Sequence, residues 1–480
     1  MNVGKQIANN VMWKYLELMS VSGIQLVCTF CLARFLTAGD YGILGMVLVF
    51  TTLANVIVDS GFGQAIIRER EVTCVDYSSV LYFNIAVSLI LYILLYLFSG
   101  AIAAFYNEPL LNNVCKVTFL VLPLNALALV QTTKLQRELK FKKLCIISIA
   151  ATILSSVIAI YVAYIYRNVW ALVVMNILIY FFKMLFLWLT TDFVPVLKFS
   201  FKSLKKYYSF SKNIMLSAII GTIFNNIYSL LIGKVYSITE LGYYSQADRI
   251  KNLGSQTTTQ VIQAVTYPFL SRINHDTGNI KEGYKKIISV SLIFVGTIMA
   301  LLMGCSPQLF ELLMGAPEWK MAGIYFLLIG INGILFPLHC VNQNILMVKG
   351  KSKTILHLEI ARRAIMVVIL LVTLNFDMFV FVFGLTIYSM LLLFLNLYYC
   401  GKPINYTLRD QLKDTMPIFL RLLIVISVAI LAGQLAADTL LVVRVMISFA
   451  TGLVVSLLLF MTHSDFRMIM NLLVSMLKHR

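Results

Sequence analysis

Long apolar runs separated by short polar segments dominate this chain. One example is Tyr41–Val58, which is preceded by a polar turn containing Thr37 and Asp40 and is followed by Asp59 and Gly61. At about 1.5 Å per residue, a helix over Tyr41–Val58 would be roughly 27 Å long, close to the thickness of the hydrocarbon core of a bilayer. This run therefore predicts a transmembrane helix that begins and ends in polar turns.

The same pattern recurs along the whole sequence and predicts an all-α polytopic membrane protein with fourteen transmembrane helices. The run over 244–270 contains several charged residues, Gln and Thr, and it is included because its beginning repeats the beginning of an earlier run. No connecting segment is long enough to fold as a separate catalytic or nucleotide-binding domain. The predicted spans are 15–33, 41–59, 79–104, 113–133, 144–166, 169–191, 209–233, 244–270, 287–313, 321–347, 354–374, 376–400, 415–436 and 440–462.

The polar turn that precedes one of the runs is repeated 200 positions later, before another run. This repeat indicates that the chain has two homologous halves. Six spans per half is an even number, so both halves enter the membrane from the same side and their repeat axis is expected to follow the membrane normal. The predicted organisation is an N-terminal lobe (1–195), an amphipathic linker helix on the inner face (196–208), a C-terminal lobe (209–400), a final helix pair (401–463) and an amphipathic cytoplasmic tail (464–480). The matching pairs are Arg34 and Lys234, Thr37 and Ser237, Asp40 and Glu240, and Gly42 and Gly242.

Composition supports a membrane environment. Of the 480 residues, 60% are hydrophobic and only 12% are charged, whereas soluble domains average about 25% charged residues. The eight cysteines lie mostly in or beside apolar runs, and the pair Cys28 and Cys31 has no second pair to complete a metal site. We therefore expect no metal and no cofactor. The polar N-terminus lacks a cleavage signal, so no signal peptide is expected.

The distribution of positive charge predicts the orientation. The chain has 39 Lys and Arg and a net charge of +18. Most of these residues fall in segments that an inward N-terminus places in the cytoplasm, so both termini are predicted to be cytoplasmic. The basic loops are short and flank apolar runs, which favours contact with anionic inner-leaflet lipid over nucleic acid. The basic residues in outer loops are Arg34, Arg167, Lys234, Lys320 and Arg444.

Two motifs stand out at the ends of predicted spans. They are Arg34…Asp40-Tyr41-Gly42…Gly45…Val49-Phe50…Asp59…Gly61…Gln64-Ala65 and Gln136-Arg137-Glu138-Leu139-Lys140-Phe141-Lys142. Both resemble motifs of the Wzx-type polysaccharide flippases, the polysaccharide transporter branch of the multidrug/oligosaccharidyl-lipid/polysaccharide exporter superfamily. Within this branch the chain is most similar to the colanic acid and teichuronic acid exporter type.

The resemblance implies a fold of two lobes like that of the MATE transporters. It implies a flippase of the bacterial inner (cytoplasmic) membrane that moves an undecaprenyl-diphosphate-linked oligosaccharide to the outer leaflet for O-antigen, capsule or exopolysaccharide assembly. Alternating access would be coupled to a gradient of H+ or Na+. The implied partners are the lipid-linked oligosaccharide, membrane lipid, and a polysaccharide polymerase and chain-length regulator.

Ionisable and polar residues within spans are costly and are therefore candidate cavity residues. A diphosphate needs cations, and sugar hydroxyls need amides and aromatic rings. Structural roles compete with this one. They are an intrahelical pair for Lys14 and Glu17, snorkelling for Arg249 and Lys251, and a salt bridge with Glu359 for Arg362 and Arg363. The candidate substrate-binding residues are Lys14, Glu17, Gln25, Lys183, Asn225, Asn226, Arg249, Lys251, Gln256, Gln260, Gln263, Asn332, His339, Arg362 and Arg363.

Two acids are candidates for ion coupling. Asp59 lies near the inner end of its predicted span, where it would either couple to a cation or help to terminate the helix before Gly61. Glu17 is the second candidate. His339 lies deep in a span and either titrates near neutral pH or is a packed, hydrogen-bonded residue.

Three alternatives compete with the flippase. An ion-coupled multidrug antiporter of the same fold would need an acidic cavity, but basic residues outnumber acids in the predicted spans. A lipid II flippase is close in kind, although the first motif favours the polysaccharide branch. A membrane polysaccharide polymerase would need a sizeable outer loop, and the loops around Glu108 and Asp377 are only a few residues long. No enzymatic activity is therefore expected.

Overall fold

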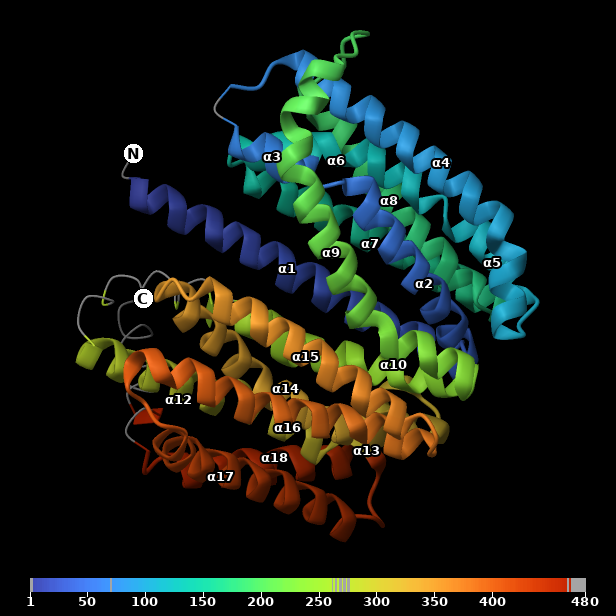
Figure 1. Ribbon diagram of the computed structural model, residues 1–480. Helices are drawn as coiled ribbons and strands as arrows, with labels where there is room; N and C mark the ends of the chain where they lie inside the picture. Colours follow the sequence, from blue (N-terminus) through green and yellow to red (C-terminus); the bar gives the residue numbers. More distant parts are fainter. Residues whose placement is uncertain are drawn as a thin grey trace. The chain divides into compact units, whose positions relative to one another are not determined.

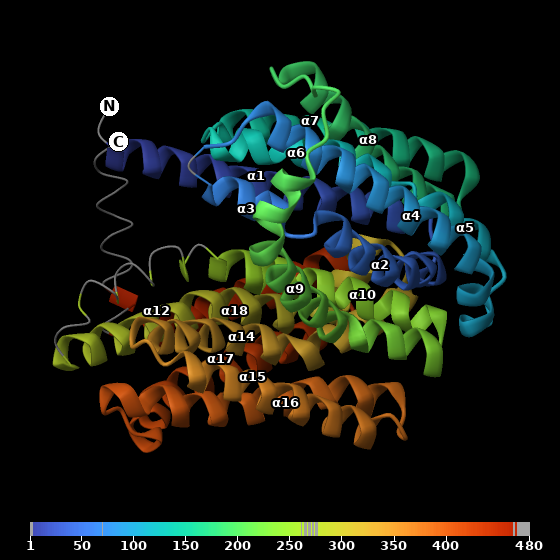
Figure 2. The same cartoon turned by 45° about the horizontal axis from the view of Figure 1, so that its top comes forward.

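The computed structural model describes residues 3–69, 71–260, 262–263, 266, 270, 273, 277–463 and 466–467. Over these residues the regular structure is helical and no strand occurs, which confirms the all-α prediction. Contacts divide the chain into two units between Ser245 and Gln246 (Figures 1 and 2). The predicted lobe boundaries remain a prediction, and the predicted tail lies outside the described residues apart from Phe466 and Arg467.

The first unit contains the helices that precede the division, and α10 crosses it. These helices are α1 (Val3–Ala33), α2 (Ala38–Asp59), α3 (Phe62–Arg68), α4 (Cys74–Tyr106), α5 (Leu110–Thr118), α6 (Val121–Arg137), α7 (Phe141–Tyr166), α8 (Trp170–Thr190), α9 (Phe201–Val235) and α10 (Ile238–Asn252).

The second unit begins within α10 and continues with a short π-helix. Its elements are η1 (Leu253–Thr257), α12 (Thr277–Gly304), α13 (Ser306–Met314), η2 (Pro317–Trp319), α14 (Lys320–Val348), α15 (Ser352–Thr373), α16 (Met378–Gly401), η3 (Lys402–Ile404), α17 (Leu408–Leu435) and α18 (Leu441–Phe460).

Among the described residues, 12 helical segments are long and apolar enough to cross a membrane, so the chain is a multi-pass membrane protein. The two other predicted spans differ in kind. Helix α15 has 22 residues but carries Glu359, Arg362 and Arg363, and the run over 244–270 passes through η1 into residues that the structure does not describe. The count of fourteen spans therefore remains a prediction.

Polar turns start the helices as the sequence predicts. The Thr37 side chain accepts a hydrogen bond from the Asp40 backbone N–H (3.4 Å), and the Asp40 carboxylate accepts one from the Thr37 N–H (2.9 Å). This reciprocal capping box supplies partners for backbone groups that the first turn leaves unpaired. In the repeated turn, the Ser237 hydroxyl accepts a hydrogen bond from the Glu240 N–H over 3.1 Å.

The repeated glycines pack reciprocally. A Cβ atom placed on Gly42 would collide with the backbone carbonyl of Ile238, and one placed on Gly242 would collide with the backbone carbonyl of Ala38. The four positions are related by the same offset of 200 residues. Helices α2 and α10 therefore approach each other through positions that the 200-residue offset relates.

The chain breaks directly after Asp59, which is the last residue of α2. Ser60 (φ 50°) and Gly61 (φ 70°) are both left-handed, and the Ser60 N–H bonds to the Val56 carbonyl. A Cβ on Gly61 would lie 2.9 Å from the Ser211 carbonyl oxygen, so this position requires glycine for both its conformation and its packing. The break directs the chain into α3.

The separate linker helix predicted over 196–208 is not formed. Residues 191–200 are not helical, because α4 holds their backbone: the Ser78 hydroxyl accepts the Val196 N–H (3.0 Å) and the Ser79 hydroxyl accepts the Ser200 N–H (2.9 Å). Helix α9 then begins at Phe201 and continues without a break for 35 residues.

The first turns of α9 bury one face against the first unit. Leu204 and Tyr207 pack in a core cluster with Phe62, Ile66 and Tyr77. Burial raises the pKa of the Tyr207 hydroxyl above its ordinary range. This segment is therefore anchored in the first unit through contacts that the linker's own sequence does not reveal.

Candidate functional site

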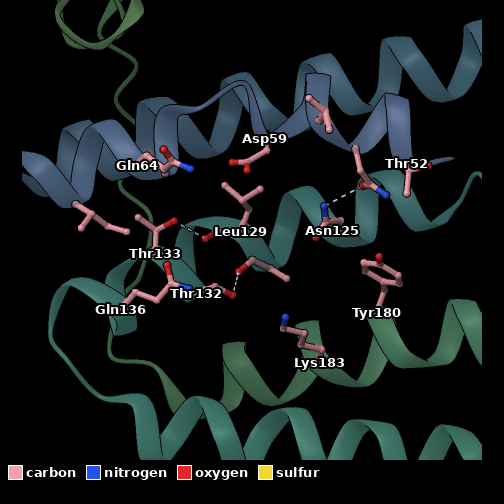
Figure 3. Close-up of a pocket in the computed structure, with 15 residues that line it drawn as sticks. Thr52, Asp59, Gln64, Asn125, Leu129, Thr132, Thr133, Gln136, Tyr180 and Lys183 are labelled. Atoms are coloured by element: carbon pink, nitrogen blue, oxygen red, sulfur yellow. Dashed lines mark hydrogen bonds between the residues drawn. The ribbon is translucent and has the colours of Figure 1, made fainter. Parts of the chain in front are cut away.

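A polar chamber of about 490 Å³ lies within the first unit, between α2, α3, α6 and α8 (Figure 3). Most of its lining side chains carry a charge, an amide or a hydroxyl, which is unusual for helices that are otherwise apolar. The polar lining residues are Thr52, Asn55, Asp59, Gln64, Asn125, Thr132, Thr133, Gln136, Tyr180 and Lys183.

Helix α6 supplies one wall because its polar residues share a helical face. Asn125, Leu129, Thr132 and Gln136 recur at spacings of three and four. The Asn125 amide donates a hydrogen bond to the Asn55 side-chain oxygen over 2.9 Å, which ties α6 to α2. The Thr132 hydroxyl donates to the Ala128 carbonyl over 2.9 Å, so its oxygen keeps accepting capacity for a ligand.

Opposite charges face the chamber from different helices. Asp59 points into it from the end of α2, and Lys183 points into it from α8 (Figure 3). Neither side chain makes a hydrogen bond or ion pair with another residue in the described part of the chain. Because unpaired charges at membrane depth are costly, these two groups are the strongest candidates for ligand contact.

Lys183 also lines a second chamber of about 160 Å³, which α1, α7 and α8 enclose. The acid in this chamber is Glu17. It forms the expected ion pair with Lys14 (2.9 Å), and its other oxygen accepts a hydrogen bond from the Ser148 hydroxyl (2.8 Å). One lysine therefore lies between two chambers that each contain a carboxylate, of which only Glu17 has partners.

In the second unit, two predicted residues belong to a buried hydrogen-bond chain. Arg362 pairs with Glu359 (2.5 Å) and donates to the Asn396 side-chain oxygen (2.8 Å). The Asn396 amide nitrogen lies 2.8 Å from His339 Nδ1, and His339 Nε2 lies 3.2 Å from the Ser389 hydroxyl. Because Arg362 occupies the amide oxygen, Asn396 donates to Nδ1, which defines a neutral His339 with its proton on Nε2.

The backbone becomes irregular after α10, where the candidate glutamines begin. Lys251 pairs with Asp248, which also accepts a hydrogen bond from the Asn252 amide over 2.8 Å. Gln256 lies within η1, where the wider turn changes the direction of the residues that follow. Gln256 and Gln260 are exposed.

The remaining candidates line neither chamber. Asn332 donates to the Leu385 carbonyl (3.4 Å), and Asn226 donates to the Thr222 carbonyl (2.8 Å) within its own helix. Arg363 lies 3.8 Å from Glu359. The other candidates that lie outside both chambers are Gln25, Asn225, Arg249 and Gln263.

Several chamber residues were not among the sequence candidates. Asn125 lies inside an apolar run and carries no charge, so it was not selected as a candidate cavity residue. Gln64 and Gln136 belong to the two motifs given above, and membership of these motifs could have identified them as candidates. Asn55, Thr132 and Tyr180 became recognisable only when α2, α6 and α8 were placed together.

The fold and these polar chambers define a multi-pass membrane protein with polar cavities between its helices. The lipid II flippase MurJ in an inward closed conformation has the same fold, with a TM-score of 0.71 and 14% identity over 94% of this chain and 99% of that chain. An inward-facing MATE multidrug transporter has a TM-score of 0.63 and 14% identity over 81% of this chain and 94% of that chain. The MATE-like fold prediction is confirmed.

The chain belongs to the family of polysaccharide biosynthesis proteins, whose model matches residues 31–323. It is 24% identical over 356 residues to the teichuronic acid biosynthesis protein TuaB of Bacillus subtilis, covering 73% of each chain. It is 22% identical to the succinoglycan biosynthesis transport protein ExoT of Rhizobium meliloti, covering 69% of this chain and 67% of that protein. The lipopolysaccharide biosynthesis protein WzxC of Escherichia coli is also 22% identical, over 60% of this chain.

Proposed function

We propose that this protein is a flippase that moves a lipid-linked oligosaccharide across the bacterial cytoplasmic membrane for the assembly of a surface polysaccharide. The observation that carries the proposal is the ammonium group of Lys183, which faces a membrane-embedded polar chamber without a partner among the described residues. The family, together with the names of TuaB, ExoT and WzxC, supports a saccharide cargo.

The chamber's chemistry suits a sugar diphosphate. Lys183 supplies a point charge for the diphosphate. The amides of Asn55, Gln64 and Gln136 can donate to and accept from sugar hydroxyls, and Tyr180 supplies an aromatic ring. The undecaprenyl chain would stay in the lipid beside the protein. Lys183 lies two turns before the inner end of α8, so the predicted topology places the chamber where a cytoplasmic substrate would enter.

We further propose that Asp59 and Glu17 serve ion coupling. A proton or Na+ on Asp59 would cancel the negative charge that faces Lys183, and this would alter the attraction of the chamber for a diphosphate. Release at the outer leaflet would deliver the repeat unit to a polysaccharide polymerase and its chain-length regulator. Both chain termini would be cytoplasmic.

Complementation of a deletion strain tests the proposal. Lipid-linked repeat units are quantified by leaflet, and surface polysaccharide is measured in parallel. Wild type should restore surface polymer, whereas Lys183→Ala should leave the intermediate in the inner leaflet, and Lys183→Arg should restore part of the export. Lys205→Ala is the matched control, because Lys205 is an exposed lysine of the same unit that lines neither chamber.

The same strains separate the alternatives. Unchanged lipid-linked intermediates together with altered resistance to cationic drugs would overturn the flippase and favour a multidrug antiporter. Loss of cell-wall lipid II export in the deletion strain would favour a lipid II flippase. Membrane levels of each variant are measured by immunoblot, so that a failure to insert is not read as a failure to transport.

A further inference from the structure

A third pocket, of about 380 Å³, lies in the first unit away from both chambers. It is formed by α4, α5 and the beginning of α8 and shares no lining residue with either chamber. Its polar lining residues are Tyr92, Tyr96, Asn113, Lys116 and Trp170, accompanied by Val117 and Leu120. The predicted topology places it toward the outer leaflet.

The polar groups of this pocket have no hydrogen-bond partners among the described residues. The Lys116 ammonium lies 5.1 Å from the centroid of the Tyr96 ring and makes no hydrogen bond or ion pair with any other described residue. The Tyr92 and Tyr96 hydroxyls, the Asn113 amide and the Trp170 indole N–H likewise have no hydrogen bond to the described part of the chain. Four kinds of hydrogen-bond donor therefore converge on one pocket.

The charge that lines the pocket is positive. Lys116 is its only charged lining residue, and no carboxylate lines it. A ligand that satisfies these groups must be an anion with several acceptor oxygens, and a phosphate has both properties. A neutral or cationic ligand would leave the lysine uncompensated.

The surface beside the pocket is apolar. On α4, Ile93 and Leu97 follow Tyr92 and Tyr96 directly in sequence, and these two side chains are 55% and 71% exposed. Together with Leu89 (44% exposed) they form a row at spacings of four residues. An exposed apolar row that leads away from a phosphate-sized polar pocket matches the two parts of a phospholipid, its acyl chains and its headgroup.

The depth of the pocket also fits a headgroup. Trp170 is the first residue of α8, and Lys116 lies in the short helix α5, which follows the end of α4. Both residues therefore lie near helix ends that the predicted topology places at the outer face. Tyr, Trp and Lys concentrate at this level of a membrane protein.

We propose that this pocket binds the headgroup phosphate of an anionic phospholipid, with Lys116 as the charge partner and the α4 row of Leu89, Ile93 and Leu97 as the acyl-chain surface. The proposal is independent of the transported substrate. It assigns the first unit a bound lipid at a site that is separate from the two chambers.

Native mass spectrometry of the full-length protein in detergent tests this assignment. The protein is titrated with phosphatidylglycerol and, separately, with phosphatidylcholine. Wild type should retain phosphatidylglycerol preferentially, and Lys116→Gln should weaken its binding by about tenfold, equivalent to about 1.4 kcal/mol. Lys116→Arg should retain binding. Lys234→Gln is the matched control, since Lys234 also lies over an aromatic ring, 4.5 Å from the centroid of Phe105, but lines none of the three pockets.

Three results would overturn the proposal. The first is equal binding of both lipids. The second is unchanged phosphatidylglycerol binding in Lys116→Gln and in a second variant, Tyr96→Leu. The third is displacement of phosphatidylglycerol by glycerol phosphate or inorganic phosphate at equal concentration, which would indicate an anion site with no acyl-chain contribution. Gel filtration and melting temperature establish that each variant is folded before its binding is measured.

Discussion

The guanidinium group of Arg362 donates a hydrogen bond to the side-chain oxygen of Asn396 over 2.8 Å. Sequence alone made Arg362 a candidate phosphate ligand. In the structure its donors are directed to Asn396 on α16 and to Glu359 one turn earlier on α15. Arg362 therefore connects two helices of the second unit and orients the amide that binds His339.

We expect Arg362→Ala to destabilise the second unit. Truncation leaves the Asn396 oxygen and the Glu359 carboxylate without their shared partner, and an unsatisfied buried polar group costs about 1–3 kcal/mol. The melting temperature of the detergent-solubilised protein should fall, and export should fall with the amount of folded protein.

Lys353→Ala is the comparison for this prediction. Lys353 is an exposed residue on the same helix, so its removal should lower the melting temperature less. If Arg362→Ala kept the wild-type melting temperature but abolished export per folded molecule, Arg362 would be a substrate ligand, as the sequence suggested, and the structural role would be wrong.

Asp59 and Glu17 should respond differently to neutralisation. Asp59→Asn removes the unpartnered charge that faces Lys183 in the large chamber, so we expect export to fall at least tenfold with normal membrane levels. Glu17→Gln should have a smaller effect, because the amide oxygen can still accept the Ser148 hydrogen bond and Lys14 is 42% exposed to solvent. Initial rates of appearance of outer-leaflet repeat units measure both effects. Equal rates for the two variants would contradict separate roles.

Gly42→Ala should prevent normal packing of α2 against α10. The added methyl group would collide with the backbone carbonyl of Ile238, which cannot rotate away. We expect the free energy of unfolding to fall by about 3 kcal/mol. Gly45→Ala is the matched control on the same helix. Its methyl group would make an ordinary 3.6 Å contact with Leu241 and should stabilise α2 by about 0.5–1 kcal/mol. Denaturation by SDS measures both changes, and similar stabilities would contradict the predicted collision.

Cys74 should report the orientation of the chain. Of the eight cysteines it is the exposed one, while the others are buried or half-buried. It begins α4, at the end that the predicted topology places in the cytoplasm. A membrane-impermeant maleimide should label inside-out vesicles and leave right-side-out vesicles unlabelled, and Cys74→Ser should abolish the signal. The opposite sidedness would overturn the prediction of cytoplasmic termini.

The sequence predicted local features well, because they depend on neighbouring residues. The pair Thr37 and Asp40 predicted the start of α2, and the long apolar runs predicted the positions of the helices. The linker helix was wrong for a long-range reason. The alternation of apolar and basic residues over 196–208 is typical of an amphipathic helix, but hydroxyl groups more than 100 positions earlier on α4 capture the Val196 and Ser200 N–H groups.

For the candidate site, too, the sequence indicated individual residues but not the contacts between distant ones. Asp59 and Lys183 were each predicted from their charge at membrane depth, but nothing in the sequence placed them in one chamber. Asn125 was missed because an uncharged amide in an apolar run is usually a helix–helix contact. His339 and Arg362 were candidate ligands because they are ionisable residues within predicted spans. Their shared partner, Asn396, lies on another helix, so the sequence could not pair them with it.

The packing of Gly42 against Ile238, and of Gly242 against Ala38, has a consequence for how the protein can vary. The atom nearest to a Cβ placed on either glycine is a main-chain carbonyl oxygen. A larger residue at either position could not be rescued by a smaller residue at the facing position, since every amino acid carries the same carbonyl. The two glycines should therefore be retained independently among homologues, without the compensatory exchange that marks covarying pairs.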